Sequence, residues 1–197
     1  ELIRQVCRVE GVHWVRILYC YPERITDQLI AVMAEEPKVV KYIDLPVQHG
    51  SGRVLREMNR QGDADSILQV VRRIREGIPG VVVRTTMIAG FPGETEEDFG
   101  ELQRLVGEAR FQRLGCFAYS QEEGTPAGER EDQLPQELRR RRADLVMEQQ
   151  APIAFAFAQS CIGKELEILV EGTEGGRYYG RSYMDAPDID TRVWFTP

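Results

Sequence analysis

The order of short apolar runs and amphipathic stretches is the strongest constraint on what this chain can fold into. Over the first two thirds of the sequence the two kinds of segment alternate. The apolar runs predict strands, and the stretches with apolar residues at helical spacing predict helices. Strands that alternate with helices imply right-handed βαβ units and a parallel sheet, either half of a barrel or part of a doubly wound sheet. The four predicted strands are residues 14–19, 41–46, 81–89 and 114–119.

Capping residues indicate where the helices begin. Thr26 is placed to cap a helix that ends before Pro37, and Asp63 is placed to cap a longer helix. Thr95 and Asp98 have the spacing of a capping box, in which each side chain bonds the backbone N–H of the other residue. The predicted helices are residues 26–36, 52–59, 63–77 and 95–109.

The last third of the chain has a different pattern. Residues 123–136 are rich in glycine, proline and charge, which predicts a loop. A helix is expected from Pro135 to about Cys161, and Pro152 should kink or break it. Apolar residues then recur with a period of two, which predicts antiparallel strands at 165–170, 177–184 and 192–195. We therefore expect three units, which are residues 1–127, a connecting segment 128–161, and a β domain at 162–197.

The composition narrows the class of protein. The 197 residues are 42% hydrophobic and 29% charged, and the net charge is −7. No apolar run reaches the roughly 20 residues of a membrane helix and no signal peptide is visible, so we expect a cytoplasmic protein without a membrane partner. The acidic balance argues against a dedicated nucleic-acid binder. Because the chain begins with Glu1 rather than Met, we expect it to be a fragment of a longer protein.

Cysteine and histidine are too few and too scattered to predict a metal site. The four cysteines form no C-x-x-C pair, which indicates free, neutral thiols. His13 and His49 are the only histidines, so a site with several histidine ligands cannot be built. The pattern predicts no metal ligand, and it leaves the catalytic residue unknown.

Ligands of parallel α/β proteins bind at the carboxyl ends of the strands, and three features are found there. Gly90 and Gly93 follow the third strand and precede a helix, which suits either a bound ligand or a tight turn. Gln48 and His49 could bind a polar ligand such as a ribose, although a paired structural role is more common. Arg84, if it points inward, needs a carboxylate partner, and a ligand could supply one.

Four consecutive arginines occupy residues 139–142 of the predicted long helix. On a helix, four consecutive residues spread over all faces, so they form no single basic stripe. Glu137, Asp144 and Glu148 lie close enough along the helix to pair with them. We therefore expect a solvated helix surface here.

Long segments over nearly the whole chain resemble one known family. They occur in the family's order, and together they resemble the radical S-adenosylmethionine methylthiotransferases. The segments are YIDLPVQH at 42–49, MNR at 58–60, RTTMIAGFPGETEEDF at 84–99, FAYSQEEGTPA at 117–127 and GRSYMDAPDID at 180–190.

Within that family the chain more closely resembles the RimO type, which adds a methylthio group to the β-carbon of an aspartate in a small-subunit ribosomal protein. Gln48-His49, residues 119–125 and residues 185–188 are similar to the RimO form. From Ser160 on, four basic residues oppose seven acidic ones, which suits a basic ribosomal protein better than RNA. Two alternatives stay open: a tRNA adenosine methylthiotransferase of the MiaB type, and a non-catalytic fragment that binds a protein.

The resemblance implies an α/β fold, namely the latter half of a partial TIM-like (radical SAM) barrel with parallel strands, followed by the start of a small all-β TRAM domain. It implies S-adenosyl-L-methionine as cofactor and two 4Fe-4S clusters in the full-length family. One cluster reduces S-adenosylmethionine to a radical that abstracts hydrogen from the target carbon, and the second is associated with sulfur donation. The family's C-x-x-x-C-x-x-C loop is absent from this sequence. We therefore expect this fragment alone to hold no cluster and to be inactive.

The resemblance also implies site residues at the matching positions. Gln48 would meet the ribose of S-adenosylmethionine, and Arg84 would meet its methionyl end. Asp185 and Asp188 would contact the ribosomal-protein substrate, and contact with RNA is not favoured. The residues expected to flank the adenine are Gly90, Gly93, Glu94, Phe117 and Tyr119.

Overall fold

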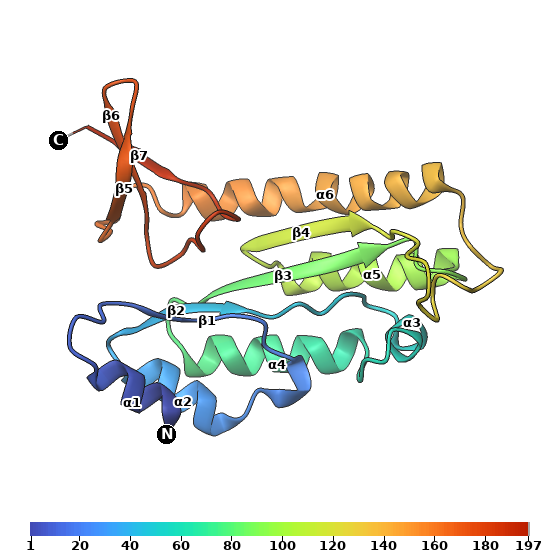
Figure 1. The fold of residues 1–197 in the computed structure, drawn as a ribbon, viewed down its shortest axis with the longest axis horizontal. Coiled ribbons are helices and arrows are strands. Elements are labelled where there is room, and N and C mark those ends of the chain that lie inside the picture. Colours follow the sequence, from blue (N-terminus) through green and yellow to red (C-terminus); the bar gives the residue numbers. More distant parts are fainter. Residues whose placement is uncertain (197) are drawn as a thin grey trace.

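A four-stranded parallel sheet forms the centre of the computed structural model, which describes residues 1–196 (Figure 1). Its strands lie in the order β1-β2-β3-β4, so each new strand is added beside the one before it. All three neighbouring pairs are parallel, as the alternation of strands and helices predicts. The strands are β1 (Val15–Ile17), β2 (Val39–Asp44), β3 (Val82–Ala89) and β4 (Arg113–Ala118).

Helices connect these strands and begin at the predicted capping residues. The Thr26 side chain accepts a hydrogen bond from the Leu29 N–H at the start of α2. Asp63 caps α4 in a capping box with Ser66, and Thr95 and Asp98 form the capping box of α5. The helices are α1 (Leu2–Arg8), the 3-10 turn η1 (Pro22–Arg24), α2 (Asp27–Glu35), α3 (Gly52–Glu57), α4 (Ala64–Gly77), α5 (Glu96–Ala109) and α6 (Gln136–Gln159).

The two faces of the sheet differ in chemistry because side chains alternate along each strand. Ile43, Val83 and Met87 belong to the apolar core that the helices α2, α4, α5 and α6 help to form. On the opposite side, here called the open face, Tyr42 and Val82 pack with apolar residues of the C-terminal part of the chain. The open face also carries charged side chains, among them Asp44 and Arg84.

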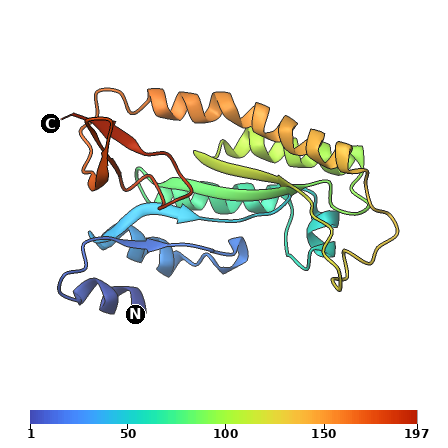
Figure 2. The same cartoon turned by 45° about the horizontal axis from the view of Figure 1, so that its top comes forward.

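The C-terminal part forms a second, antiparallel sheet of three strands, β5 (Leu169–Glu174), β6 (Arg177–Arg181) and β7 (Val193–Phe195). Gly175 and Gly176 connect β5 to β6, and both have positive φ angles, as a tight hairpin turn of the I′ type requires. Figures 1 and 2 place this sheet near the amino-terminal ends of β2 and β3, whereas α3 lies near their carboxyl ends. The predicted fold class, a half-barrel sheet followed by a small β domain, is confirmed.

Several local predictions differ from the structure. The helix α1 was not predicted, and the strand expected at 165–170 begins only at Leu169. The helix α6 continues through Pro152, so the break that was one of the two expected outcomes does not occur. Pro152 is exposed, so the backbone carbonyl that loses its partner there faces water, which removes most of the cost of the missing hydrogen bond.

None of the helices within residues 1–196 is both long enough and apolar enough to cross a membrane.

Candidate functional site

The carboxyl ends of β2, β3 and β4 meet at one edge of the parallel sheet, where the sequence places most candidate residues. Gln48 extends the pairing of β2 with β3, because its N–H donates to the Thr86 carbonyl at 2.9 Å and its carbonyl accepts from the Ile88 N–H at 2.8 Å. The Tyr119 N–H donates to the Ala89 carbonyl at 2.8 Å. The structure therefore brings Gln48 and the segments after β3 and β4 to the same edge.

A pocket of about 250 Å³ lies at the ends of β1 and β2. Gln48 lines it, and its side-chain amide forms no hydrogen bond with another group of residues 1–196. Two lining residues other than glycine have positive φ angles, Gln48 at +72° and Tyr19 at +58°. Such strained backbone is concentrated at functional sites. The lining residues are Tyr19, Tyr21, Asp44, Pro46, Gln48, Arg60 and Thr86.

Arg84 points toward the open face of the sheet, but its carboxylate partner belongs to the protein. Its Nη1 lies 2.7 Å from Oδ1 of Asp44 and donates a second hydrogen bond to Thr86. Burial acts to lower the pKa of Arg84, but the hydrogen bond to Asp44 and the nearby carboxylates outweigh it, so the pKa is raised. Arg84 therefore has the carboxylate partner that it needs, but this partner is Asp44, the facing residue in β2, and not a ligand.

Asp44 is the residue that connects Arg84 to the pocket. Its Oδ1 is held by Arg84, and its Oδ2 accepts a hydrogen bond of 3.1 Å from the Tyr19 backbone N–H. The Asp44 side chain is 3% exposed, so both oxygen atoms depend on these protein donors. Asp44 therefore helps to fix Tyr19 in its unusual backbone conformation at the pocket wall.

Behind this edge, Glu94 is the centre of a buried polar network, the Glu94 network, which also contains His49 and Arg142. The carboxylate of Glu94 accepts hydrogen bonds from the N–H groups of Gly90 and Phe91, and Arg142 Nη1 lies 2.7 Å from its Oε1. The side chain of Glu94 is fully buried. The structure therefore does not bring this carboxylate to the pocket.

His49 has a structural position in the Glu94 network. Its Nδ1 accepts a hydrogen bond from the Ser51 N–H, so this nitrogen carries no proton. Its Nε2 then donates to Oε2 of Glu94 at 3.1 Å. Of the two interpretations of Gln48-His49, the paired structural role describes His49, whereas Gln48 remains available to a ligand.

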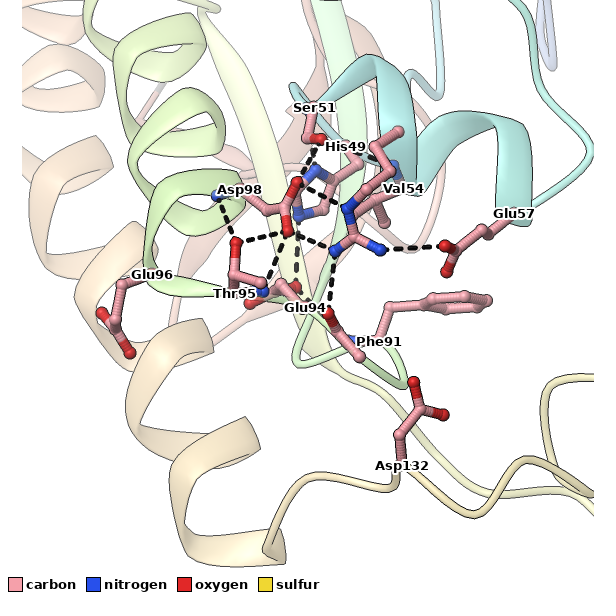
Figure 3. A network of polar contacts seen from close by, with 12 residues as sticks. His49, Ser51, Val54, Glu57, Phe91, Glu94, Thr95, Glu96, Asp98 and Asp132 are labelled. Atoms are coloured by element: carbon pink, nitrogen blue, oxygen red, sulfur yellow. Dashed lines mark hydrogen bonds and ion pairs between the residues drawn. The ribbon is translucent and has the colours of Figure 1, made fainter.

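Asp98 lies next to the Glu94 network and holds the start of α3 against the start of α5 (Figure 3). It accepts hydrogen bonds from Ser51 and Thr95, and it forms an ion pair with Arg53. Burial acts to raise the pKa of Asp98, but the hydrogen bonds from Arg53, Ser51 and Thr95 outweigh it and hold the pKa below its ordinary value. Asp98 therefore stays ionised under ordinary conditions.

Arg142 corrects the expectation of a solvated surface at residues 139–142. Its side chain is 4% exposed, and it bonds both the carboxylate and the backbone carbonyl of Glu94, together with Glu96. The physical reason is that α6 packs against α5 and β4, so one of the four arginines must face inward. A buried guanidinium persists only where carboxylates compensate it, and Glu94 supplies that charge.

Gly90 and Gly93 serve backbone geometry in this structure. A Cβ atom on Gly90 would lie 2.8 Å from the Cα of Arg139, so only glycine permits α6 to pass this close to the end of β3. Gly93 has a φ of +71°, and a Cβ there would meet Asp132 at 2.4 Å. Both observations support the tight-turn interpretation of these glycines.

Phe117 and Tyr119 differ in how far they are available to a ligand. Phe117 lies on the open face of β4 and is 61% exposed. Tyr119 packs edge-on against Phe91, with ring centroids 5.3 Å apart, and Arg139 lies over its ring. The Tyr119 hydroxyl is buried and has no hydrogen-bond partner among residues 1–196.

The two aspartates predicted to contact a substrate also differ. Asp185 is 2% exposed, and its Oδ1 lies 2.6 Å from Nη2 of Arg113 in β4. Its other oxygen accepts a hydrogen bond from the Ser182 hydroxyl. Asp185 therefore holds the chain against the sheet and presents no free carboxylate, whereas Asp188 is exposed.

Four residues that hold the site together were not among the predicted site residues, namely Asp44, Asp190, Arg113 and Arg142. Asp44 could have been found from the strand pattern, because it faces Arg84 across the β2–β3 pair. Nothing local in the sequence indicates that Arg113 or Arg142 meets a carboxylate more than 45 residues away.

Two ranges of the chain match known protein-family models. Residues 1–106 match the model of the Radical SAM superfamily, and residues 162–197 match that of the TRAM domain. The chain belongs to the radical SAM superfamily. The boundaries predicted at 127 and 161 stay predictions.

Curated relatives of this radical SAM chain resemble it over nearly its whole length. The ribosomal protein uS12 methylthiotransferase RimO of Desulfitobacterium hafniense is 50% identical over 98% of the chain. The RimO of Symbiobacterium thermophilum is 51% identical over 99% of it. The chain spans 44% and 41% of these two relatives. The predicted resemblance to the RimO type is confirmed.

Solved structures of other radical SAM enzymes share the fold. The coproporphyrinogen III oxidase HemN of Escherichia coli aligns with 77% of this chain and 34% of its own, at a TM-score of 0.54 and 23% identity. The methyltransferase TsrM of Kitasatospora setae aligns with 64% of this chain and 26% of its own, at a TM-score of 0.52 and 18% identity. At these identities the likeness concerns the fold alone.

The superfamily implies S-adenosylmethionine and a 4Fe-4S cluster, and the residues of this chain fit only the first. The unpaired Gln48 amide offers a donor and an acceptor at the strand ends, which suits ribose hydroxyl groups. Burial raises the pKa of the Cys20 thiol to about 11 and that of Cys116 to about 12. Within residues 1–196 no three cysteine, histidine or carboxylate side chains are grouped so that they could hold a metal ion.

Proposed function

We propose that this chain is the later barrel sheet and the first part of the β domain of a RimO-type methylthiotransferase. The reaction would add a methylthio group to the β-carbon of an aspartate in ribosomal protein uS12. The observation that carries the proposal is the 50% identity to a RimO over 98% of the chain, which includes both the strand-end pocket and the β domain. The proposed setting is the cytoplasm, where ribosomal proteins are found.

Within that reaction, Gln48 would bind the ribose of S-adenosylmethionine. Phe117, Tyr119 and the backbone at Gly90 and Gly93 would flank the adenine, while Glu94 would act only through the turn that its carboxylate holds. Arg84 would set the position of Asp44 rather than bind the methionyl carboxylate directly. S-adenosylmethionine, together with the reduced clusters of the full-length family, would supply the radical chemistry.

The charges of the β domain support a protein partner less strongly in the structure than in the sequence. Asp185 and Asp190 form ion pairs with Arg113 and Arg84 of the sheet, so their charges do not face a partner. The remaining five carboxylates after Ser160 oppose four basic residues, so the exposed surface is only slightly acidic. The choice of uS12 over tRNA therefore rests on the RimO likeness. Asp188, beside the exposed Ile189, is the proposed contact for the protein substrate.

The test uses the complete protein encoded by the gene that contains this chain. The protein, with its clusters reconstituted, is incubated with S-adenosylmethionine, a sulfide source and either purified uS12 or unmodified tRNA. Mass spectrometry of the digested products then locates any methylthio group. We expect it on one aspartate of uS12. A methylthio-adenosine in tRNA would instead establish the MiaB-type alternative, and binding of uS12 without product would establish the non-catalytic one.

A matched pair of variants tests the proposed role of Gln48. Gln48→Ala removes the amide at the pocket, whereas Gln69→Ala removes an exposed amide on α4. We expect Gln48→Ala to weaken S-adenosylmethionine binding about tenfold, as the loss of one or two hydrogen bonds does. Gln69→Ala should bind like the parent protein. Equal affinities for the two variants would remove Gln48 from the site.

A further inference from the structure

The loop between β6 and β7, residues 182–192, carries two aspartates that reach the open face of the parallel sheet. Asp185 meets Arg113 of β4, and Asp190 lies beside Arg84 of β3. Arg84 and Arg113 are direct neighbours across the β3–β4 pair. The two contacts therefore use the same chemistry, one carboxylate and one arginine, at adjacent positions of the same sheet.

Asp190 is nearly buried, and its Oδ2 is the oxygen that accepts hydrogen bonds. Its Oδ2 accepts hydrogen bonds from the Tyr42 hydroxyl at 2.7 Å and from the Ala186 N–H at 2.8 Å. Its Oδ1 lies 4.0 Å from Nε of Arg84, and the Asp190 side chain is 5% exposed. At this depth a charge without a compensating partner is costly, and Arg84 is the cation that lies within 4.0 Å of Asp190.

Arg84 connects Asp190 to the strand-end pocket. Its guanidinium group lies between two carboxylates, Asp190 toward the β domain and Asp44 toward the pocket. Asp44 lines the pocket and holds the Tyr19 N–H, and Tyr19 forms part of the same wall. Two side chains thus separate the β domain from the backbone of the pocket, although the domain lies near the opposite end of the strands (Figure 1).

Asp185 and Arg113 have no such connection. Asp185 is bonded by Arg113, Ser182 and Thr191, and none of these lines the strand-end pocket. Loss of either aspartate should loosen the loop on the sheet. Only the loss of Asp190 should also change the charge balance around Arg84, and so free Arg84 to shift relative to Asp44.

We propose that Asp190 is a positioning residue for the cofactor pocket: through Arg84 it holds Asp44, and through Asp44 it holds Tyr19. The C-terminal β domain thereby does more than offer a surface, because its docking sets the shape of a pocket on the barrel sheet. The identity of the pocket's ligand as S-adenosylmethionine rests on the proposed function.

The experiment compares Asp190→Asn with Asp185→Asn in the complete protein. Hydrogen–deuterium exchange followed by mass spectrometry reports how well the Tyr19 amide is protected. This amide donates its hydrogen bond to the Asp44 carboxylate. Equilibrium dialysis with labelled S-adenosylmethionine gives its dissociation constant. For Asp190→Asn we expect faster exchange at residues 17–21 and about tenfold weaker binding, within the range of couplings carried by such networks. For Asp185→Asn we expect both to match the parent protein, even where its melting temperature falls.

Kinetics give a third readout that a merely stabilising contact would not change. With purified uS12, Asp190→Asn should raise the KM for S-adenosylmethionine, whereas Asp185→Asn, which loosens the same loop, should leave that KM at the parent value. If Asp190→Asn does not fold, Arg84→Lys replaces it, because lysine keeps the charge but cannot reach both carboxylates. It should speed exchange at residues 17–21 in the same way.

Each outcome decides the proposal. Equal exchange and equal affinity for the two aspartate variants would overturn it and leave the proposed function intact. The same holds for Arg84→Lys if exchange at residues 17–21 stays at the parent rate. A parent protein that binds no S-adenosylmethionine would overturn the proposed function, and the assignment of the pocket's ligand would fail with it.

Discussion

Within residues 1–196, a buried arginine–carboxylate network lies on each side of the parallel sheet, and the two networks connect different parts of the chain. The Glu94 network lies among the helices and contains Glu94, His49 and Arg142. The open-face network contains Arg84 and Arg113 of the sheet, together with Asp44, Asp185 and Asp190. The first is confined to the α/β part of the chain. The second joins the α/β part to the C-terminal β domain.

This difference shows that similar ion pairs can have different consequences. In the Glu94 network every partner belongs to one folding unit, so loss of a partner leaves an uncompensated charge in the core. In the open-face network the partners belong to two units, so the same loss can be relieved by separation of the units. The first network should therefore control global stability, and the second should control the docking of the β domain.

The largest effect should come from Arg142→Met. It leaves the fully buried Glu94 carboxylate without its cation, and we expect the free energy of unfolding to fall by about 3–5 kcal/mol. Chemical denaturation measures the change. The matched control is Glu96→Gln, because Glu96 bonds the same arginine but its side chain is 82% exposed. That variant should lose less than about 1 kcal/mol. A similar loss in both variants would contradict the central role of Glu94.

Arg113→Met should have a smaller effect, which concerns the docking of the β domain rather than the stability of the whole fold. This change leaves Asp185 unpaired, and we expect the β domain to separate from the sheet at a cost of about 2–3 kcal/mol. Trypsin should then cut faster after the exposed Lys164, between α6 and β5, while the α/β part keeps its melting temperature. Arg177→Met, which removes an exposed arginine of β6, is the control and should cut at the parent rate. Joint unfolding of both parts would show that the networks are not separable.

Acid should weaken the helix side of the molecule through Asp98, which lies next to the Glu94 network. The pKa of Asp98 is lowered in the folded state, so its contribution is present above the ordinary value near 4 and is lost as the pH falls below it. We expect about 2 kcal/mol of stability to disappear between about pH 5 and pH 2. Denaturation curves across that range measure it, and Asp98→Asn should flatten the dependence. An unchanged slope in that variant would show that other carboxylates dominate.

The smallest effect concerns two cysteine thiols, Cys20 near Asp44 and Cys116 near Glu94. Burial raises the pKa of Cys20 to about 11 and that of Cys116 to about 12, so both stay protonated at pH 8. Because the thiolate is the nucleophile, iodoacetamide should modify both much more slowly than a free cysteine. Peptide mapping after timed alkylation measures the rates. Fast modification of Cys116 in the native protein would mean that β4 opens away from α6.

Much of the fold could be predicted from the sequence because its signals are local. The caps at Thr26, Asp63 and Thr95 mark helix starts that the structure confirms to the residue. The β-branched run before Gly90 likewise marks β3. The expectation of a break at Pro152 was wrong because it treated the residue without knowing which face of α6 would meet water.

The candidate site was less predictable because its decisive contacts join distant residues. Gln48 was found from its place after a strand. The direction of Arg84 was left open, and the structure turns its side chain toward Asp44 on the open face. Two distant partners, Asp190 for Arg84 and Arg142 for Glu94, could not be found, since they come close only after the β domain and α6 have docked. Burial then removed Glu94 and Asp185 from the set of side chains that a ligand can reach.

Gln48 has a positive φ angle, a backbone conformation that favours glycine. Selection for stability and selection for ligand binding therefore oppose each other at this position. A glycine there would relieve a strain of about 1–2 kcal/mol, so a screen for heat resistance would favour it. The same exchange would remove the unpaired amide from the pocket. A thermostable descendant of this protein that carries glycine at position 48 would therefore show that its lineage no longer needs the ligand.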